Sequence, residues 1–165
     1  MLVPRPVPSS RFSVRRVGDQ QQVHAETAIA AGERIMRVAG EEVARPTRHS
    51  IQVGVDLHLE SFGKDASDLG SAWRYLNHSC APNARMQGRD LVALRAIANG
   101  EQVTFDYNAN EWDMATPFLC ACGAAKCRGL IRGYKHLSSA LRAEIAEHVS
   151  EHIQQLSLSL PSGRA

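Results

Sequence analysis

The sequence has no long hydrophobic run and no strong excess of charge. No apolar stretch approaches the roughly 18 residues that a transmembrane helix needs, so we expect no membrane association. Residues 1–8 alternate proline with other residues and lack a continuous apolar core, which makes them a poor secretion signal. A net charge of +2 gives no direct signal for nucleic acid. We therefore expect a soluble intracellular protein, cytoplasmic, or nuclear if the source is eukaryotic or the protein is delivered to a host.

Cysteine is also scarce, and its four copies are unevenly placed. None precedes Cys80, and the other three form the run Cys120, Cys122 and Cys127. In a chain without a secretion signal this usage favours metal binding or catalysis over disulfides. Structural zinc prefers four tetrahedral ligands, so the run needs a fourth thiol, and Cys80 is the only one left. Two disulfides, or four inert buried thiols, are the alternatives.

The remaining sequence predicts one domain of short strands. At 165 residues the chain is long enough for one domain with a real core and short for two. Period-two alternation predicts strands at 12–17, 50–59, 91–94 and 103–107. Two similar Gly-containing stretches, 28–35 and 96–103, predict similar turn–strand corners.

The C-terminal part has the one strong helical pattern, from Ser138 to about Leu156. His148 and His152 lie four residues apart, a spacing that suits a metal pair. Both histidines fall outside the apolar stripe, and glutamates stand beside them. We therefore place them on a solvated helix face.

Two stretches concentrate unusual polar chemistry. Residues 74–83 read Arg-Tyr-Leu-Asn-His-Ser-Cys-Ala-Pro-Asn, and residues 100–107 read Gly-Glu-Gln-Val-Thr-Phe-Asp-Tyr. Alternation puts Val103, Phe105 and Tyr107 on one face of a strand. Taken alone, this is compatible with an ordinary core strand that ends in a tyrosine.

Together with the cysteine run 120–127, these stretches closely resemble the SET-domain protein lysine methyltransferases that carry a post-SET zinc motif. The resemblance covers roughly residues 11–134, and the motifs stand in the family's order. It implies a mainly β (α+β) fold, the SET fold of small curved β-sheets with a pseudoknot, divided into a SET domain (11–117) and a post-SET zinc segment (118–134). The residues themselves add a flexible N-terminal arm (1–10), a C-terminal amphipathic α-helix (135–156) and a flexible tail (157–165).

The resemblance also implies a function and the residues that perform it. The function is methylation of lysine side chains on a protein substrate with S-adenosylmethionine, and histone is the family's commonest theme. Arg74, Asn77 and His78 match residues that bind the cofactor, and Tyr107 matches the catalytic tyrosine beside the transferred methyl. Phe105 matches a position that influences how many methyl groups are added. The resemblance places Cys80, Cys120, Cys122 and Cys127 on the structural zinc.

One departure supports a rival interpretation. The family usually has Gly-x-Gly near the start of the domain, where the backbone approaches the cofactor, and here the aligned residues are Gln20–Gln22. Glutamine is bulkier and lacks glycine's conformational freedom. The alternative is therefore a catalytically silent SET-fold module that binds zinc and serves interaction. A third interpretation is an unrelated zinc-stabilised interaction domain. The target lysine and the oligomeric state are not indicated.

Overall fold

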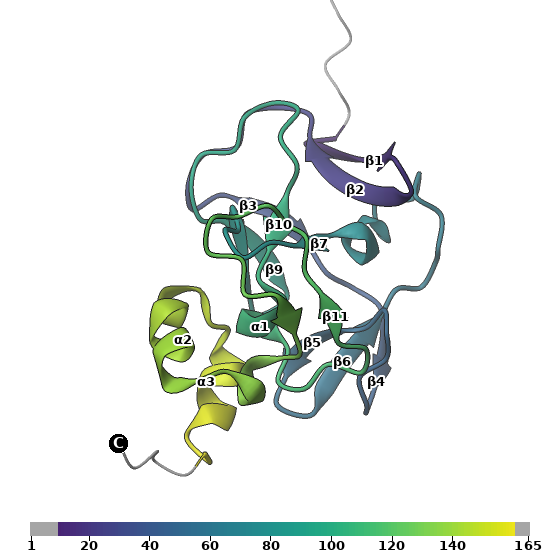
Figure 1. The fold of residues 1–165 in the computed structure, drawn as a ribbon. Coiled ribbons are helices and arrows are strands. Elements are labelled where there is room, and N and C mark those ends of the chain that lie inside the picture. Colours follow the sequence, from purple (N-terminus) through teal and green to yellow (C-terminus); the bar gives the residue numbers. More distant parts are fainter. Residues whose placement is uncertain (1–9, 161–165) are drawn as a thin grey trace, which may run out of the picture.

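The computed structural model describes residues 10–160, so most of the expected arm and residues 161–165 of the expected tail lie outside it. The described chain is mainly β, with small sheets and short helices (Figure 1). The strands are β1 (Phe12–Val17), β2 (Gln20–Ala25), β3 (Arg34–Arg37), β4 (Glu41–Val43), β5 (Ile51–Gly54), β6 (Leu57–Glu60), β7 (Asn77–His78), β8 (Ala84–Gln87), β9 (Asp90–Ala93), β10 (Thr104–Phe105), β11 (Phe118–Leu119) and β12 (Leu130–Ile131). The helices are η1 (Ala72–Tyr75), α1 (Tyr107–Asn110), η2 (Tyr134–His136), α2 (Ser139–Glu144), η3 (Ala146–His148) and α3 (Glu151–Ser157).

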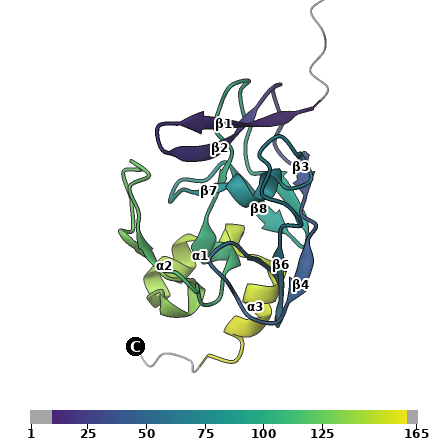
Figure 2. The same ribbon diagram turned by 90° about the vertical axis from the view of Figure 1, so that its right-hand side faces the viewer.

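The sheets have two or three strands each. The orders are β3-β9-β8 and β4-β6-β5 for the larger two, and β1-β2, β7-β10 and β11-β12 for the pairs. The β1–β2 hairpin and helices α2 and α3 lie at opposite ends of the molecule in both Figure 1 and Figure 2. Within the described residues, no helix is long and apolar enough to cross a membrane.

Two hydrophobic clusters form the interior. The larger lies among the strands and includes Val23, Leu59, Leu91 and Val103, each with 0% of its surface exposed. The smaller joins α1 and η2 to the C-terminal helices and is built from Ala109, Tyr134, Ile145, Val149 and Ile153. The C-terminal helices therefore bury their apolar side chains against α1 and η2.

The predicted strand at 50–59 is wrong in one respect: it is a hairpin. Residues 55–56 form a turn between β5 and β6, and Ile51 pairs with Leu59. A two-residue turn by itself pairs an even-numbered with an odd-numbered residue, as it does for Gly54 and Leu57, but a register shift between Gln52 and Gly54 corrects this. Odd-numbered Ile51 therefore lies opposite odd-numbered Leu59, and the apolar alternation continues through the hairpin. Periodicity alone could not reveal the reversal.

The single helix predicted over 135–156 is also wrong, because the segment divides into η2, α2, η3 and α3. The backbone is extended at Val149 and Ser150. There the Ser150 N–H donates to the Ala109 oxygen at 2.9 Å, and the Ser150 hydroxyl donates to Asn110 Oδ1 at 2.7 Å. At Ser150 these buried hydrogen bonds take the place of the hydrogen bonds that a continuous helix would form. His152 is consequently 6% exposed and contacts the Asn110 oxygen through Nε2 at 2.8 Å, so its predicted place on a solvated face is wrong.

The two similar corners are joined to each other. Ile29 and Ile97 exchange both backbone hydrogen bonds at 2.9 Å. Each corner has a glycine with positive φ, +80° at Gly32 and +83° at Gly100, a conformation that glycine adopts without steric cost. The likeness between residues 28–35 and 96–103 thus reflects one paired structural element.

Candidate functional site

The two polar motif stretches lie side by side. Strand β7 pairs with β10 in parallel, with Asn77 opposite Thr104 and His78 opposite Phe105. Residues 27 positions apart in the chain are therefore neighbours in space. This pairing brings the predicted cofactor residues against the predicted catalytic tyrosine.

Tyr107 lies at the start of a helix and not at the end of a strand, which corrects the strand predicted over 103–107. Asp106 ends the strand, because its side chain accepts a hydrogen bond from the Asn108 N–H at 3.0 Å and caps α1. The Tyr107 hydroxyl donates to the Leu76 oxygen at 2.6 Å. Burial, followed by the nearby Glu111, raises the pKa of Tyr107, so its hydroxyl stays protonated.

Three rings surround Tyr107. The Phe105 ring centre is 4.9 Å away, that of His78 is 5.3 Å away, and that of Phe118 is 5.9 Å away. Phe105 was predicted at this site, whereas Phe118 was not. Its only signal in the sequence is its place two residues before Cys120.

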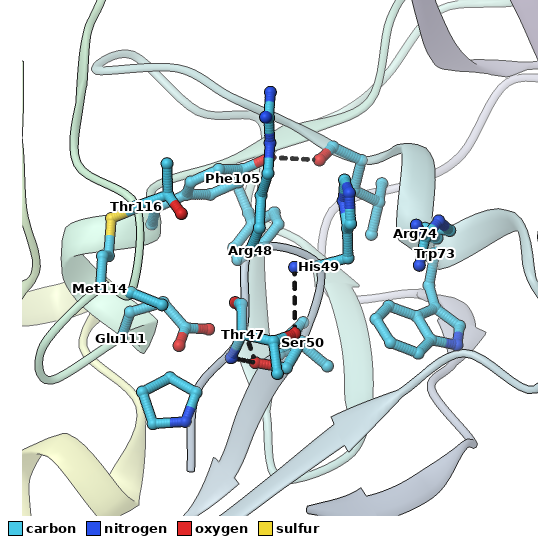
Figure 3. Close-up of a pocket in the computed structure, with 15 residues that line it drawn as sticks. Thr47, Arg48, His49, Ser50, Trp73, Arg74, Phe105, Glu111, Met114 and Thr116 are labelled. Carbon is cyan, nitrogen blue, oxygen red and sulfur yellow. Dashed lines mark hydrogen bonds between the residues drawn. The ribbon is translucent and has the colours of Figure 1, made fainter.

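Two pockets meet at Tyr107. The large pocket encloses about 1690 Å³, part of it open to solvent, and contains Arg74, Asn77 and His78 together with residues 19–22 and 118–122. The small pocket has a volume of about 560 Å³, part of it also open to solvent (Figure 3). It is lined by residues 46–51, 114–116, Trp73, Phe105, Glu111 and the shared residues. The residues common to both pockets are Arg48, His49, Arg74, Leu76 and Tyr107. A molecule in each pocket would thus contact the same tyrosine.

The glutamine run lies where the alignment of the motifs put it. Gln20, Gln21 and Gln22 are part of β2 and line the large pocket. The Asn77 side chain donates from Nδ2 to the Gln21 oxygen at 3.1 Å. The backbone of the run thus holds one of the predicted cofactor residues in place.

His78 links Tyr107 to the cysteines. Its Nδ1 accepts a hydrogen bond from the Tyr107 N–H at 3.1 Å, and its Nε2 lies 3.3 Å from Cys80 Sγ. Burial and the positive charge of Arg128 lower the pKa of His78 to about 4, so the ring is neutral at pH 7. Arg128, which sequence reasoning missed, forms a buried ion pair with Asp106 at 2.6 Å.

The four cysteines come together as counting predicted, and all four are free thiols. Their Sγ atoms lie within 4.8 Å of one another. A tetrahedral zinc site with bonds of about 2.3 Å has sulfur–sulfur separations of about 3.8 Å, so this set, the thiol cluster, fits the metal with small adjustments. The Cys80 N–H points to Cys122 Sγ at 3.5 Å, and the Arg128 N–H to Cys80 Sγ at 3.4 Å. Such N–H groups stabilise thiolates.

A fold of small sheets, with paired motif strands, a tyrosine between two pockets and a thiol cluster, defines the SET class. The SET-domain family profile matches residues 21–108, more than half of the 165 residues. The chain belongs to the SET-domain family. The third interpretation, an unrelated zinc domain, is therefore wrong.

The curated relatives carry methyltransferase names. "Histone-lysine N-methyltransferase, H3 lysine-4 specific" of Emericella nidulans is 30% identical over 77% of this chain and 12% of its own length. "Methyltransferase flvH" of Aspergillus flavus is 34% identical over 59% of this chain and 52% of its own. "Histone-lysine N-methyltransferase ash1" of Drosophila melanogaster is 32% identical over 67% of this chain and 6% of its own. The chain thus spans about half of one relative and a small part of the other two.

Solved structures agree on the fold. The methyltransferase domain of human SETMAR has a TM-score of 0.55 at 18% identity, over 74% of this chain and 58% of that one. Arabidopsis thaliana SUVH6, solved in complex with SAM, has a TM-score of 0.58 at 19% identity, over 72% of this chain and 32% of that one. At these identities the likeness concerns the fold.

Proposed function

We propose that this chain is an S-adenosylmethionine-dependent methyltransferase that acts on lysine side chains of a protein substrate. The observation that carries the proposal is the position of Tyr107, which lines both the large and the small pocket. The family supports lysine methylation as the reaction. The large pocket then takes the cofactor, and the small pocket takes the target side chain.

Arg74, Asn77 and His78 are the residues that would hold the cofactor, since all three line the large pocket. The bound cofactor supplies a methyl group on a cationic sulfur. Asn77 is fixed by the Gln21 oxygen and His78 by the Tyr107 N–H, so these side chains are oriented before binding. Such preorganisation lowers the free energy needed to align two reactants, a contribution of about 7 kcal/mol or more.

The target nitrogen must lose a proton before it can attack. An ordinary lysine has a pKa near 10.4, so deprotonation at pH 7 costs about 4.6 kcal/mol. Burial in the small pocket disfavours the ammonium and lowers that cost. The Tyr107 hydroxyl donates to the Leu76 oxygen, so the hydroxyl oxygen keeps acceptor capacity toward the reacting groups. Phe105, whose ring lies beside that of Tyr107, is the residue that would influence how many methyl groups are added.

A zinc ion would be bound by Cys80, Cys120, Cys122 and Cys127. Its role would be structural, because four thiolates leave no open position on the metal. We treat residues 11–117 as the SET domain and 118–134 as the post-SET zinc segment. The four free thiols agree with a location inside the cell, because thiols stay reduced there. Histone H3 is the first substrate to test, because the Emericella nidulans relative is named as specific for lysine 4 of H3.

The test is transfer of labelled methyl groups from S-adenosylmethionine to core histones and other lysine-rich proteins. We expect label in the wild type and none in Tyr107→Phe. Tyr134→Phe is the matched control, because Tyr134 is buried beside Trp112 in the smaller cluster and should leave transfer intact. Absence of transfer to every substrate, the protein itself included, together with no cofactor binding by calorimetry, would refute the proposal.

A silent interaction module is the second candidate, and the glutamine run favours it. Gln21 and Gln22 are half-buried at the large pocket, where the family usually has glycine. This candidate binds zinc but has little affinity for S-adenosylmethionine. Calorimetry with the cofactor separates the two: a measurable heat of binding supports the enzyme, and its absence in a zinc-loaded protein supports the silent module.

A further inference from the structure

The small pocket contains a carboxylate that the proposed reaction does not use. Among the described residues that line it, Glu111 alone is acidic. Its backbone is fixed on both sides, since its N–H donates to the Tyr107 oxygen at 2.8 Å and its oxygen accepts from the Tyr134 N–H at 2.8 Å. The residue is 8% exposed. Glu111 is therefore a fixed part of the wall.

The two carboxylate oxygens of Glu111 have different surroundings. Oε1 accepts hydrogen bonds from the Gln52 N–H at 2.9 Å and from Asn110 Nδ2 at 3.1 Å. Oε2 takes no hydrogen bond from residues 10–160, and Figure 3 shows the carboxylate pointing into the pocket. A nearly buried carboxylate with unused acceptor capacity is unfavourable until a donor reaches it.

The chain does not neutralise this carboxylate itself. Within residues 10–160, Glu111 forms no ion pair, although Arg48, His49 and Arg74 line the same pocket. Burial raises the pKa of Glu111 to about 7, against the hydrogen bonds from Gln52 and Asn110. A cation that arrives from outside is the partner this group lacks.

We propose that Glu111 is a specificity-determining residue whose free oxygen receives the ammonium group of the target side chain, so that the small pocket selects cations. The identity of that side chain as a lysine rests on the proposed function, whereas selection of an ammonium does not. Lysine suits the site because its charge is compact and sits at the end of a thin apolar stem. The apolar wall from Trp73, Leu76, Phe105 and Met114 receives such a stem.

The pairing is compatible with a neutral nucleophile. The two opposite charges stabilise each other on binding, whereas burial penalises the ammonium and the carboxylate alike. One proton can pass from Nζ to Oε2, which breaks an N–H bond, forms an O–H bond and leaves an amine and a carboxylic acid. The same contact that selects the cation thus offers a place for its proton.

The test uses n-butylammonium, with n-butanol as its uncharged counterpart, titrated into the full chain and followed by NMR at the Trp73 indole. At pH 8 we expect the wild type to bind the ammonium about tenfold or more tightly than the alcohol, the strength of a charged hydrogen bond. Glu111→Gln keeps an oxygen for Gln52 and should lose this preference. Glu144→Gln removes an exposed glutamate elsewhere and should keep it.

The preference should also shrink from pH 8 to pH 5.5 as Glu111 takes up a proton. The other titratable or charged groups that face it from the neighbouring elements are Arg48, His49, Arg74, Tyr107 and, behind Asn110, His152. Tyr107 stays protonated over this range, because burial raises its pKa. His49→Gln and His152→Gln test the two histidines, and both should retain the pH effect.

Equal affinity for the ammonium and the alcohol in the wild type, or an undiminished preference in Glu111→Gln, would overturn the inference. Failure of methyl transfer with an intact preference for the ammonium would remove the proposed function and leave the selective pocket. Transfer without any preference would do the opposite.

Discussion

Helix α1 is held from two sides by different kinds of contact. On one side, His78, Asp106 and Arg128 connect it to the thiol cluster. On the other side is what we call the amide network, made of Gln52, Asn110, Glu111, Ser150 and His152, all buried. The first side depends on sulfur atoms that the proposed zinc ion would hold together, whereas the second consists of hydrogen bonds between protein groups, with Glu111 Oε2 left free. Tyr107 therefore lies between contacts to the thiol cluster, which would depend on bound zinc, and the amide network, which the protein forms without a metal.

Removal of the proposed zinc ion should have the largest effect, and it should weaken only the first of the two supports. Binding of structural zinc contributes on the order of 10 kcal/mol to ordering a small segment. With zinc bound, a chelator or Cys80→Ser should abolish amide-exchange protection in residues 118–131 and leave α3 protected. Cys80 contacts His78, so protection at β7 should fall as well. Equal loss of protection in α3 would mean that the two supports are one cooperative unit.

Asn110→Ala removes a central side chain of the amide network. Its side chain donates to the Gln52 oxygen at 2.9 Å and accepts from the Ser150 hydroxyl at 2.7 Å. Because its partners stay buried without it, we expect a loss of about 4 kcal/mol in the free energy of unfolding. Denaturant titration measures this, and zinc content should stay unchanged. Asn99→Ala, at an exposed turn, is the matched control and should change stability by less than about 0.5 kcal/mol.

The pH dependence sharpens the same contrast. Glu111 has its pKa raised by burial from 4.5 to about 7, so folding favours its protonated form. Its contribution is fully present below pH 4.5 and is lost as pH rises through 7. The loss amounts to about 3 kcal/mol. The difference in unfolding free energy between the wild type and Glu111→Gln should therefore shift by this amount between pH 4.5 and 8. A flat difference would contradict the assignment.

Tyr107→Phe should have the smallest effect on stability and yet abolish methyl transfer. It removes one hydrogen bond, from the hydroxyl to the Leu76 oxygen, worth about 1 kcal/mol. The ring contacts with Phe105 and His78 remain. Unfolding measurements and the transfer assay on the same preparation check both parts. A loss of several kcal/mol would mean that Tyr107 acts mainly as a structural residue.

The motifs predicted the centre of the molecule better than its periphery. Cysteine counting placed Cys80 with the distant thiols because zinc needs a fixed number of ligands. The motif resemblance placed Asn77 and Tyr107 together, and β7 and β10 do pair. The hairpin at 51–60 was missed because the register shift in β5 keeps the apolar alternation continuous through the turn. Local periodicity likewise could not predict that the helix is interrupted at Ser150, where the Ser150 N–H donates to the Ala109 oxygen.

Glu111 was missed for a related reason. In the sequence it is one glutamate among several near the end of a motif. Its burial is created by contacts with Gln52, 59 positions earlier, and by the helices that follow. His152 looked solvated for the same cause, since its partner Asn110 is 42 positions away. Long-range hydrogen bonds to the backbone leave no periodic trace.

The bridge between Ile29 and Ile97 has a consequence for how this fold can change in length. The bridge closes the chain between Ile29 and Ile97 into a large loop. Within that loop, residues 61–70 contain no strand or helix. Once a loop is closed, doubling its length costs only about 0.6 kcal/mol in chain entropy. Insertions between β6 and η1 should therefore be tolerated while the paired corners hold. The paired corners would then keep the surrounding sheets in place while the loop between β6 and η1 varies in length.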